Sequence, residues 1–216
     1  MTRPPSRTSG TAAIDVHAVG KRRGGRWVLD DVSFTVEAGE VTALVGGNGA
    51  GKSTLLACAA GALEPDRGWI AIAGATSGRR RHVGYAPEAG DAPGHLTGAE
   101  LWALVAALRG GPATRGVDDA AARLLGLAPL ASMRLERMSL GQRRRAVLAA
   151  ALIGAPPALL LDEPDNGLDA AGLDALATLV TREAARGAAV LVATHDPSVR
   201  ERLAARTITL VDGRLA

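Results

Sequence analysis

The sequence predicts an α/β fold whose core is a mostly parallel sheet, with an N-terminal antiparallel β subdomain and an inserted helical subdomain. Three observations predict it. Short, fully apolar segments at 158–161, 190–193 and 208–211 have the pattern of strands buried on both faces, and a helical pattern at 172–186 lies between the first two. Two earlier segments alternate between polar and apolar residues, as half-buried strands do. A long stretch of helical character separates the two sets of strands.

The N-terminal part is expected to pair its strands. Segments 14–19 and 32–36 have the half-buried pattern, and the turn-rich segment 21–26 separates them. The first dozen residues are rich in Arg, Pro, Ser and Thr, which predicts a disordered tail over 1–12 and a single domain over 13–216. Further short strands are expected at 41–45, 70–73 and 82–86.

The helical subdomain is expected at about 90–150. Thr97 and Glu100 have the spacing of a capping box, which marks the start of a helix. The apolar residues expected on one face of that helix are Leu101, Leu104, Val105 and Leu108. A second helix is predicted at 117–126, and a third after Gln142. The arginine clusters 79–81 and 143–145 are open to two interpretations: a solvated surface, or contact with phosphate or lipid headgroups.

Composition excludes several classes of protein. The chain has 216 residues, 47% of them hydrophobic, and a net charge of only +3, which suits a compact domain better than a polybasic binder. Three tryptophans, one tyrosine and one phenylalanine provide no stacking platform for single-stranded nucleic acid. The single cysteine, Cys58, cannot form an internal disulfide, which fits a reducing cytoplasm. No segment reaches the roughly 18 apolar residues that span a bilayer, so contact with a membrane would require a partner.

A phosphate-binding loop is the strongest motif. The run 46–54 reads GGNGAGKST and satisfies G-x-x-x-x-G-K-[ST]. Its glycines let backbone N–H groups surround the β- and γ-phosphates, at the start of a helix whose positive end points at them. Lys52 is one of only two lysines, so a compact ammonium stands where a planar guanidinium would fit poorly. The candidate residues are Gly46, Gly47, Asn48, Gly49, Ala50, Gly51, Lys52, Ser53 and Thr54.

Two adjacent carboxylates, Asp162 and Glu163, follow the apolar segment 158–161. Taken alone, they could simply end a strand. Beside a phosphate loop they suggest two separate tasks. Asp162 would hold Mg²⁺ through water, with the Ser53 hydroxyl as another metal ligand, while Glu163 would polarise the water that attacks the γ-phosphate.

A second anion site is suggested by Ser139, Gly141 and Gln142, which stand at the start of a predicted helix. The alternative is an ordinary Ser N-cap. The order of motifs is informative: phosphate loop, helical stretch, Ser-x-Gly-Gln, strand with Asp-Glu, Asn-Gly-Leu-Asp at 166–169, and finally a strand followed by Thr-His-Asp at 194–196.

In this set and order of motifs the chain resembles the ATP-binding subunit of an ABC transporter, over about residues 14–214. In that family 46–54 corresponds to the Walker A loop, 138–142 to the signature, and 159–163 to the Walker B strand. The resemblance implies that Glu163 is the catalytic base and that His195 is the switch histidine contacting the γ-phosphate. Segment 166–169 corresponds to the loop that crosses to a sister subunit.

The resemblance also implies a P-loop NTPase core that uses ATP and Mg²⁺. Ser53, Glu88 and Asp162 would surround the metal. Two subunits, either two copies of this chain or one copy and a close paralogue, would hold ATP head to tail. Each ATP would lie between Lys52 of one subunit and the signature of the other, and the contact set would be completed by Ser139, Gly141, Gln142 and Asp169. A transmembrane permease subunit would be the further partner. The protein would then be cytoplasmic and peripheral on the inner face of the cell membrane, with no nucleic acid bound.

The chain departs from the family pattern in several places. Where the family has an aromatic residue for stacking on adenine, this sequence has Arg23, whose guanidinium plane can also stack on a base. Trp27 lies nearby, and its place in the pattern favours a core position. Glu88 stands where a glutamine is usual. The signature has Met138 and Leu140 at two altered positions, and Gly47 replaces the usual Pro, which loosens the loop without removing catalytic groups.

Three readings of function follow. The first is the energising subunit of a membrane transporter. The second is a soluble ABC-type ATPase in a process such as iron–sulfur cluster assembly. The third, a generic phosphate-loop NTPase, is disfavoured by the signature and His195. Glu88, segment 166–169 and the short stretch after Asp212 favour an exporter. The cargo is not encoded in these motifs.

Overall fold

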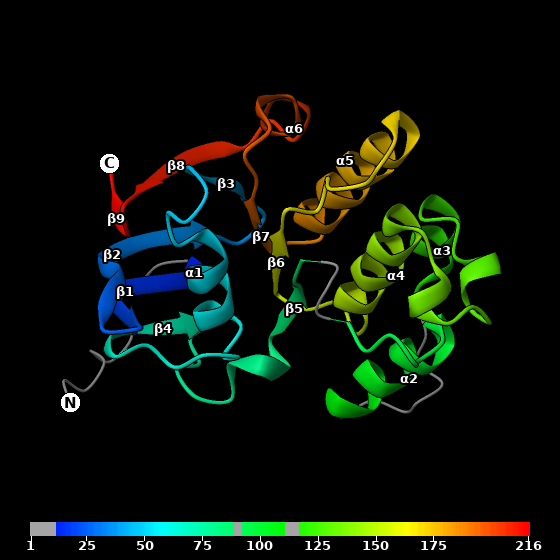
Figure 1. Ribbon diagram of the computed structural model, residues 1–216, viewed down its shortest axis with the longest axis horizontal. Coiled ribbons are helices and arrows are strands. Elements are labelled where there is room, and N and C mark those ends of the chain that lie inside the picture. Colours follow the sequence, from blue (N-terminus) through cyan, green and yellow to red (C-terminus); the bar gives the residue numbers. More distant parts are fainter. Residues whose placement is uncertain (1–11, 89–91, 111–116) are drawn as a thin grey trace.

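The computed structural model describes residues 12–88, 92–110 and 117–216 and contains two sheets (Figure 1). The smaller sheet is antiparallel, with the order β2-β1-β4: β1 (Ala12–Arg23), β2 (Arg26–Glu37) and β4 (Arg67–Ile72). The larger sheet has the order β5-β6-β7-β3-β8-β9: β3 (Val41–Val45), β5 (Val83–Ala86), β6 (Ala158–Asp162), β7 (Ala189–Ala193), β8 (Arg206–Val211) and β9 (Arg214–Leu215). All its described pairings are parallel except β8 with β9. The predicted fold class is confirmed.

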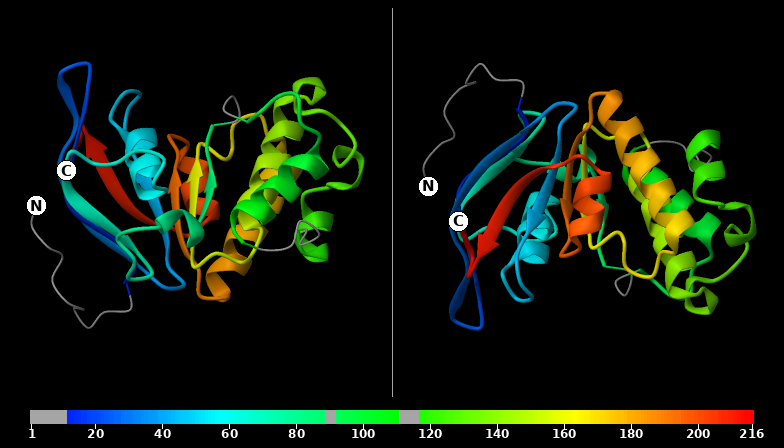
Figure 2. Two further views of the ribbon diagram at one scale, coloured as in Figure 1. Left: turned by 90° about the horizontal axis from the view of Figure 1, so that it is seen from below. Right: turned by 90° about the horizontal axis from the view of Figure 1, so that it is seen from above.

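The helices form layers around these sheets. They are α1 (Lys52–Ala59), α2 (Gly98–Leu108), α3 (Asp119–Leu124), α4 (Leu140–Leu152), α5 (Ala170–Ala185) and α6 (Pro197–Arg202), with short 3₁₀ turns η1 (Arg79–Arg81), η3 (Ala128–Leu130) and η4 (Leu135–Arg137). Figure 2 shows α1 between the antiparallel sheet and the larger sheet, with α2–α5 beyond the larger sheet. Helix α1 contacts strands of both sheets.

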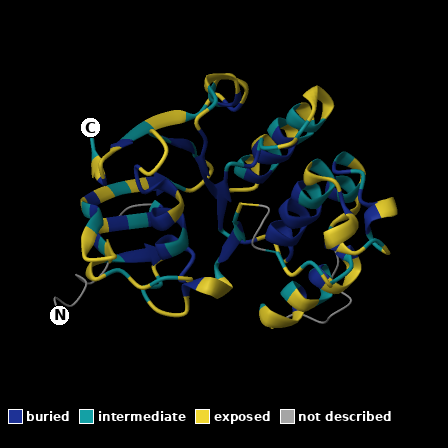
Figure 3. Ribbon diagram, viewed as in Figure 1, coloured by how far each residue is buried: buried dark blue, intermediate teal, exposed yellow. Residues whose placement is uncertain are grey.

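The buried apolar side chains form two clusters, and the residues of β6 are divided between them. Successive residues of a strand point to opposite faces. Ala158 and Leu160 therefore join the cluster that contains α1, while Leu159 and Leu161 join the cluster formed with α4 and α5. All four are buried, which explains why this strand is apolar without alternation (Figure 3).

The N-terminal hairpin is longer than predicted. Strands β1 and β2 extend as far as the pair Arg23↔Arg26, so the turn is only Gly24 and Gly25 rather than 21–26. Both glycines have positive φ, at 55° and 80°, which glycine adopts without strain. The strand also begins at Ala12, one residue inside the predicted tail; residues 1–11 of that tail lie outside the described residues.

The prediction for α2 is correct at its start and correct for only part of its face. Thr97 and Glu100 form the capping box, in which Glu100 N–H donates to Thr97 Oγ1 over 3.3 Å. Leu101 is buried, but Leu104 and Leu108 are exposed. The helix contacts α4 through a stripe rotated from the predicted one, where Trp102 Nε1 donates to Ala146 O over 3.0 Å.

For Arg79 and Arg144 a solvated surface is the wrong interpretation of the arginine clusters, because both side chains are buried and bind the protein's own carbonyl groups. Arg79 is buried and pairs with Glu64 at 3.2 Å. Arg80 donates twice to Gly61 O, at the end of α1. Arg144 is fully buried. Among the residues that the structure describes, no helix has the length and apolar character that crossing a membrane requires.

Candidate nucleotide site

The candidate site lies at the carboxyl edge of the larger sheet, where β6, β7 and β3 are neighbours. In the parallel registers, Asp162 pairs with Ala193, and Ala193 pairs with Leu44. The residues that follow these strands therefore meet at one edge: Glu163 after β6, His195 after β7, and the phosphate loop after β3. Such strand ends are where open α/β sheets bind their ligands.

Two glycines of the phosphate loop are dictated by their surroundings. A Cβ on Gly46 would collide with the carbonyl oxygen of Leu210. Gly51 has a φ of 106°, and a Cβ there would lie 2.7 Å from Val28 O. A Cβ on Gly47, by contrast, would meet no atom of the described residues within 4 Å, so there is room for a larger residue where the family has Pro.

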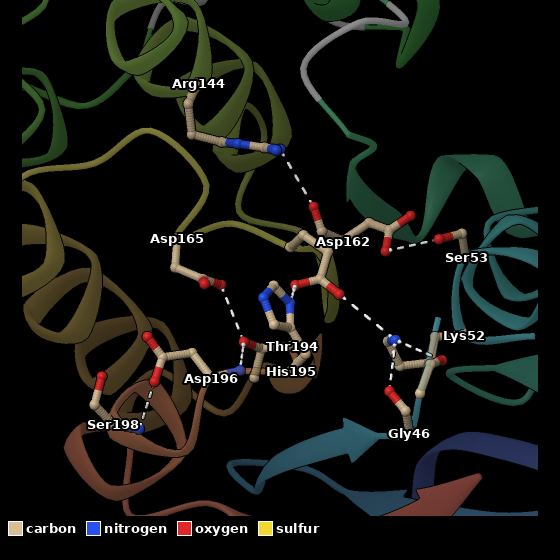
Figure 4. Close-up of polar contacts among 12 residues, drawn as sticks. Gly46, Lys52, Ser53, Arg144, Asp162, Asp165, Thr194, His195, Asp196 and Ser198 are labelled. Atoms are coloured by element: carbon tan, nitrogen blue, oxygen red, sulfur yellow. Dashed lines mark hydrogen bonds and ion pairs between the residues drawn. The ribbon is translucent and has the colours of Figure 1, made fainter. Parts of the chain in front are cut away.

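Helix α1 begins at Lys52 without a side-chain cap. Because the first amide groups of a helix have no partner within it, this end can bind an anion. The Lys52 side chain is largely buried and lies across the loop. Its Nζ donates to Gly46 O over 2.9 Å and lies 3.6 Å from Glu163 Oε1 (Figure 4). The ammonium is thus fixed between the loop and the predicted base.

Asp162 and Ser53 form the candidate metal-binding corner. Ser53 Oγ donates to Asp162 Oδ1 over 3.1 Å. Burial raises the pKa of Asp162, and the charges of Glu163 and Glu88 raise it further, against the lowering effect of the Ser53 hydrogen bond. A hydroxyl oxygen beside crowded carboxylates is a donor set that suits Mg²⁺, which takes further oxygens from phosphate and water.

Glu163 is held on several sides. Its φ is 45°, a left-handed conformation that is uncommon for residues other than glycine, and its N–H donates to Ala193 O over 2.8 Å. Its Oε2 lies 2.8 Å from His195 Nδ1. The backbone is therefore constrained at the residue that ends β6, as is common at functional sites.

The hydrogen bond to Glu163, together with the Glu163 charge, raises the pKa of His195 above its usual value. The stabilisation from the charged pair is present below the ordinary histidine pKa and is lost as pH rises through the raised one. We expect NMR titration of the histidine ring to show this elevation, and Glu163→Gln to lower the His195 pKa. An unchanged His195 titration in Glu163→Gln would contradict the pairing.

One open pocket of about 480 Å³ brings most of the predicted residues together. It is lined by Arg23, Val28, Asn48, Gly49, Ala50, Gly51, Lys52, Ser53, Thr54, Glu88, Glu163, Asn166 and His195. The sequence analysis did not predict Val28 as a site residue, although it directly follows Trp27. Trp27 is not part of this lining. Its ring lies between the guanidinium groups of Arg22 and Arg67, at 4.3 Å and 4.1 Å from its centroid, which leaves Arg23 as the candidate for contact with a base.

The signature residues line a different pocket. Ser139, Gly141, Gln142 and Asp169 face it together with Gly167. Ser139 and Gln142 form a capping box at the start of α4, so the Ser N-cap interpretation holds as far as the cap itself. Gly141 lies so close to Gly167 O that a Cβ would not fit. Asp169 Oδ1 accepts from Gly172 N–H over 2.8 Å and caps α5.

Sequence reasoning missed further polar residues at the site. Asp165 Oδ1 accepts from Thr194 Oγ1 over 3.1 Å, which ties the segment after β6 to the segment after β7. Burial raises the pKa of Asp165. Arg144 Nη1 donates to the carbonyl oxygens of Pro87 at 2.9 Å and Asp162 at 3.2 Å. Asp165 could have been predicted as a site residue because it is close in the sequence to Asp162 and Glu163. For Arg144 the sequence offered no signal beyond its place in a basic cluster.

A phosphate loop between a parallel strand and a helix, next to a strand that ends in Asp-Glu, defines a P-loop nucleoside triphosphatase. The ABC transporter family matches residues 29–166. The chain belongs to this family.

Relatives support the assignment. The chain is 36% identical over 208 residues to a cobalt import ATP-binding protein of Rhodobacter capsulatus, covering 89% of this chain and 72% of that protein. It is 38% identical over 186 residues to a cytochrome c biogenesis ATP-binding export protein of Zymomonas mobilis, covering 86% of this chain and 80% of that protein. Against an Fe(3+) import ATP-binding protein of Rhodococcus jostii it is 37% identical and spans 62% of that protein's length.

Solved structures agree. An ATP-binding subunit of an ABC transporter matches with a TM-score of 0.83 and 31% identity, over 94% of this chain and 88% of that one. A dimeric ATP-binding cassette in a post-hydrolysis state with ADP and Pi matches with a TM-score of 0.81 and 25% identity, over 94% and 96%. The chain is therefore an ATP-binding subunit of the ABC type, and an ATPase.

Proposed function

We propose that this chain binds Mg·ATP in the pocket around Lys52 and that its hydrolysis drives transport through partner transmembrane subunits. One observation carries the proposal: a single pocket gathers residues 48–54 of the phosphate loop with Glu88, Glu163 and His195, while the signature residues line another. The first pocket supplies groups for binding and hydrolysis. The second pocket supplies the signature residues, which would complete the nucleotide site of a sister subunit.

Each residue has a proposed task. Lys52 and the amide groups at the start of α1 would bind the β- and γ-phosphates. Ser53, Asp162 and Glu88 would hold Mg²⁺, which neutralises phosphate charge when it is bound. Glu163 would orient the attacking water and take its proton. His195, held by Glu163, would contact the γ-phosphate.

We propose that two subunits close on two ATP molecules, each between the phosphate loop of one and the signature of the other. The subunits are two copies of this chain, or this chain and a close paralogue. The separation of the two pockets supports this arrangement, and so does the dimeric state of the related cassette. If the dimer is the active form, turnover per subunit rises with protein concentration. Turnover that is constant at high dilution would contradict it.

Transport is proposed from the named relatives, which include importers and exporters. We propose export, at the inner face of the cell membrane, because Glu88 and segment 166–169 resemble the exporter pattern. The test is affinity purification of the chain from detergent-solubilised membranes. A polytopic membrane protein in the complex supports transport. Recovery with soluble partners alone supports the rival, an ATPase of iron–sulfur assembly.

The contact with adenine gives a further prediction. Replacing Arg23 by Tyr places an aromatic ring where the pocket has a guanidinium, and stacking on a base is worth on the order of 1 kcal/mol or more. We expect Arg23→Tyr to tighten ATP binding several-fold in isothermal titration calorimetry. Arg26→Tyr is the matched control, because Arg26 is exposed on the same hairpin and does not line the pocket. Equal affinities of wild type and Arg23→Tyr would show that Arg23 does not face the base.

A further inference from the structure

Arg144 is a fully buried guanidinium, 0% exposed, whose Nη1 donates to the carbonyl oxygens of Pro87 and Asp162. Among the residues that the structure describes, its Nε and Nη2 have no hydrogen-bond partner. Burying unpaired donors on a charged group destabilises a fold. Local packing alone therefore does not account for an arginine at this position.

The surroundings of Arg144 are strongly acidic. The charges of Glu88, Asp162, Asp165 and Glu163 all act on it and oppose the lowering of its pKa by burial. Lys52 faces this group from the phosphate loop, 3.6 Å from Glu163. Arg144 enters from the opposite side, out of α4 (Figure 4). A fixed cation beside crowded carboxylates reduces their mutual repulsion.

The bonds of Arg144 also join three separate segments. Pro87 directly precedes Glu88, and Asp162 ends β6. Helix α4, which carries Arg144, begins with the signature residues that line the other pocket. One side chain thus binds the carbonyl oxygen of Asp162 and that of the residue before Glu88, and it belongs to the helix that presents the signature.

We propose that Arg144 is a positioning residue for ATP hydrolysis: its charge offsets the repulsion among the surrounding carboxylates, and its bonds hold Glu88 and Asp162 in place. The inference rests on the proposed function of this pocket. It assigns Arg144 no contact with nucleotide. Its action passes through the residues that the guanidinium holds.

The charge is tested by substitution and rescue. Arg144→Gln removes it, and loss of a residue that orients metal ligands typically lowers activity about 10- to 100-fold. Arg144→Lys keeps the charge, so we expect turnover closer to wild type than in Arg144→Gln. Asp165→Asn removes one nearby carboxylate charge, and its amide oxygen can still accept from Thr194. Added to Arg144→Gln, it should recover part of the lost turnover. Arg143→Gln, a charge loss one residue away, is the matched control.

A binding measurement gives a second readout. Without the Arg144 charge the pocket is more negative, so ATP in the presence of EDTA should bind Arg144→Gln several-fold more weakly, and Asp165→Asn should restore that binding. A merely structural role would not be reversed by Asp165→Asn. Circular dichroism checks that each variant is folded. If Arg144→Gln is unfolded, the test is the turnover of a folded Arg144→Lys: a rate near wild type supports the proposal, and loss of turnover overturns it.

The proposal is overturned if Arg144→Gln hydrolyses ATP like wild type, or if Asp165→Asn restores neither turnover nor metal-free ATP binding. It is equally overturned if a folded Arg144→Lys is as impaired as Arg144→Gln. Absence of turnover in wild-type protein would contradict the proposed function instead, and the comparison of metal-free ATP binding would still decide the role of Arg144.

Discussion

Glu163→Gln is expected to abolish ATP turnover while ATP binding persists. The amide has the shape of the carboxylate but cannot take a proton from water, and general-base catalysis typically contributes about 10²- to 10⁴-fold. The neighbouring contacts, to His195 at 2.8 Å and Lys52 at 3.6 Å, hold the side chain in place. With the γ-phosphate uncleaved, the proposed dimer should persist. Phosphate release assays and size-exclusion chromatography with ATP measure the two effects.

The control for this variant is Glu201→Gln, which removes the same charge from an exposed position on α6. It should turn over ATP at the wild-type rate and elute as wild type does. A Glu163→Gln protein with wild-type turnover would show that another group takes the proton. Retained binding without a trapped dimer would contradict the shared-ATP arrangement alone.

Lys52→Ala is expected to have the second largest effect, a loss of ATP binding. The ammonium is nearly buried between Gly46 O and Glu163, so its removal leaves the Glu163 charge facing the phosphates. A charge-assisted hydrogen bond is worth about 1.5–3 kcal/mol, which is roughly 10- to 100-fold in affinity. Titration with a fluorescent ATP analogue and a turnover assay measure it.

The chain provides its own control, because Lys21 is its other lysine. Lys21 Nζ donates to Glu64 O over 2.7 Å and pairs with Asp66, away from the pocket. Lys21→Ala should lose a little stability, within about 1 kcal/mol for such an ion pair, and bind ATP normally. If both lysine variants lose ATP binding equally, the effect arises from stability and not from the phosphate loop.

The parallel core could be predicted from the sequence because its signal is local. Strands buried on both faces are mainly apolar, as β7 is throughout and β6 is up to its last residue, Asp162. The hairpin and α2 were harder. Arg22 and Arg23 look like turn residues, yet both continue β1, where they pair with Trp27 and Arg26 and where the Arg22 guanidinium lies over the Trp27 ring. On α2, Leu104 is exposed while Trp102 contacts α4, and periodicity alone does not show which side of the helix meets α4.

The candidate site divides in the same way. Lys52, Asp162 and Glu163 were grouped from their motifs, and His195 from the family resemblance; all four stand at or after the ends of parallel strands, which share one edge of the sheet. The choice between Arg23 and Trp27 as the residue that contacts adenine required the structure, because only the structure shows that Arg22 and Arg67 cover the Trp27 ring. Arg67 is far from Trp27 in the sequence, so this contact could not be predicted from the sequence.

The position of α1 between two sheets limits which part of the molecule can move. Its apolar side chains, Leu55 and Leu56, are buried in the cluster shared with strands of both sheets, so displacing the helix would open that core on two sides at once. We therefore expect α1, and with it the end of the phosphate loop, to stay in place during the proposed ATPase cycle. Rearrangement is then expected in the helices beyond the far face of the larger sheet, α2–α5. The antiparallel sheet, whose Arg23 and Val28 line the nucleotide pocket, packs against α1 from the other side, so we expect motion to pass through the opposite half of the subunit.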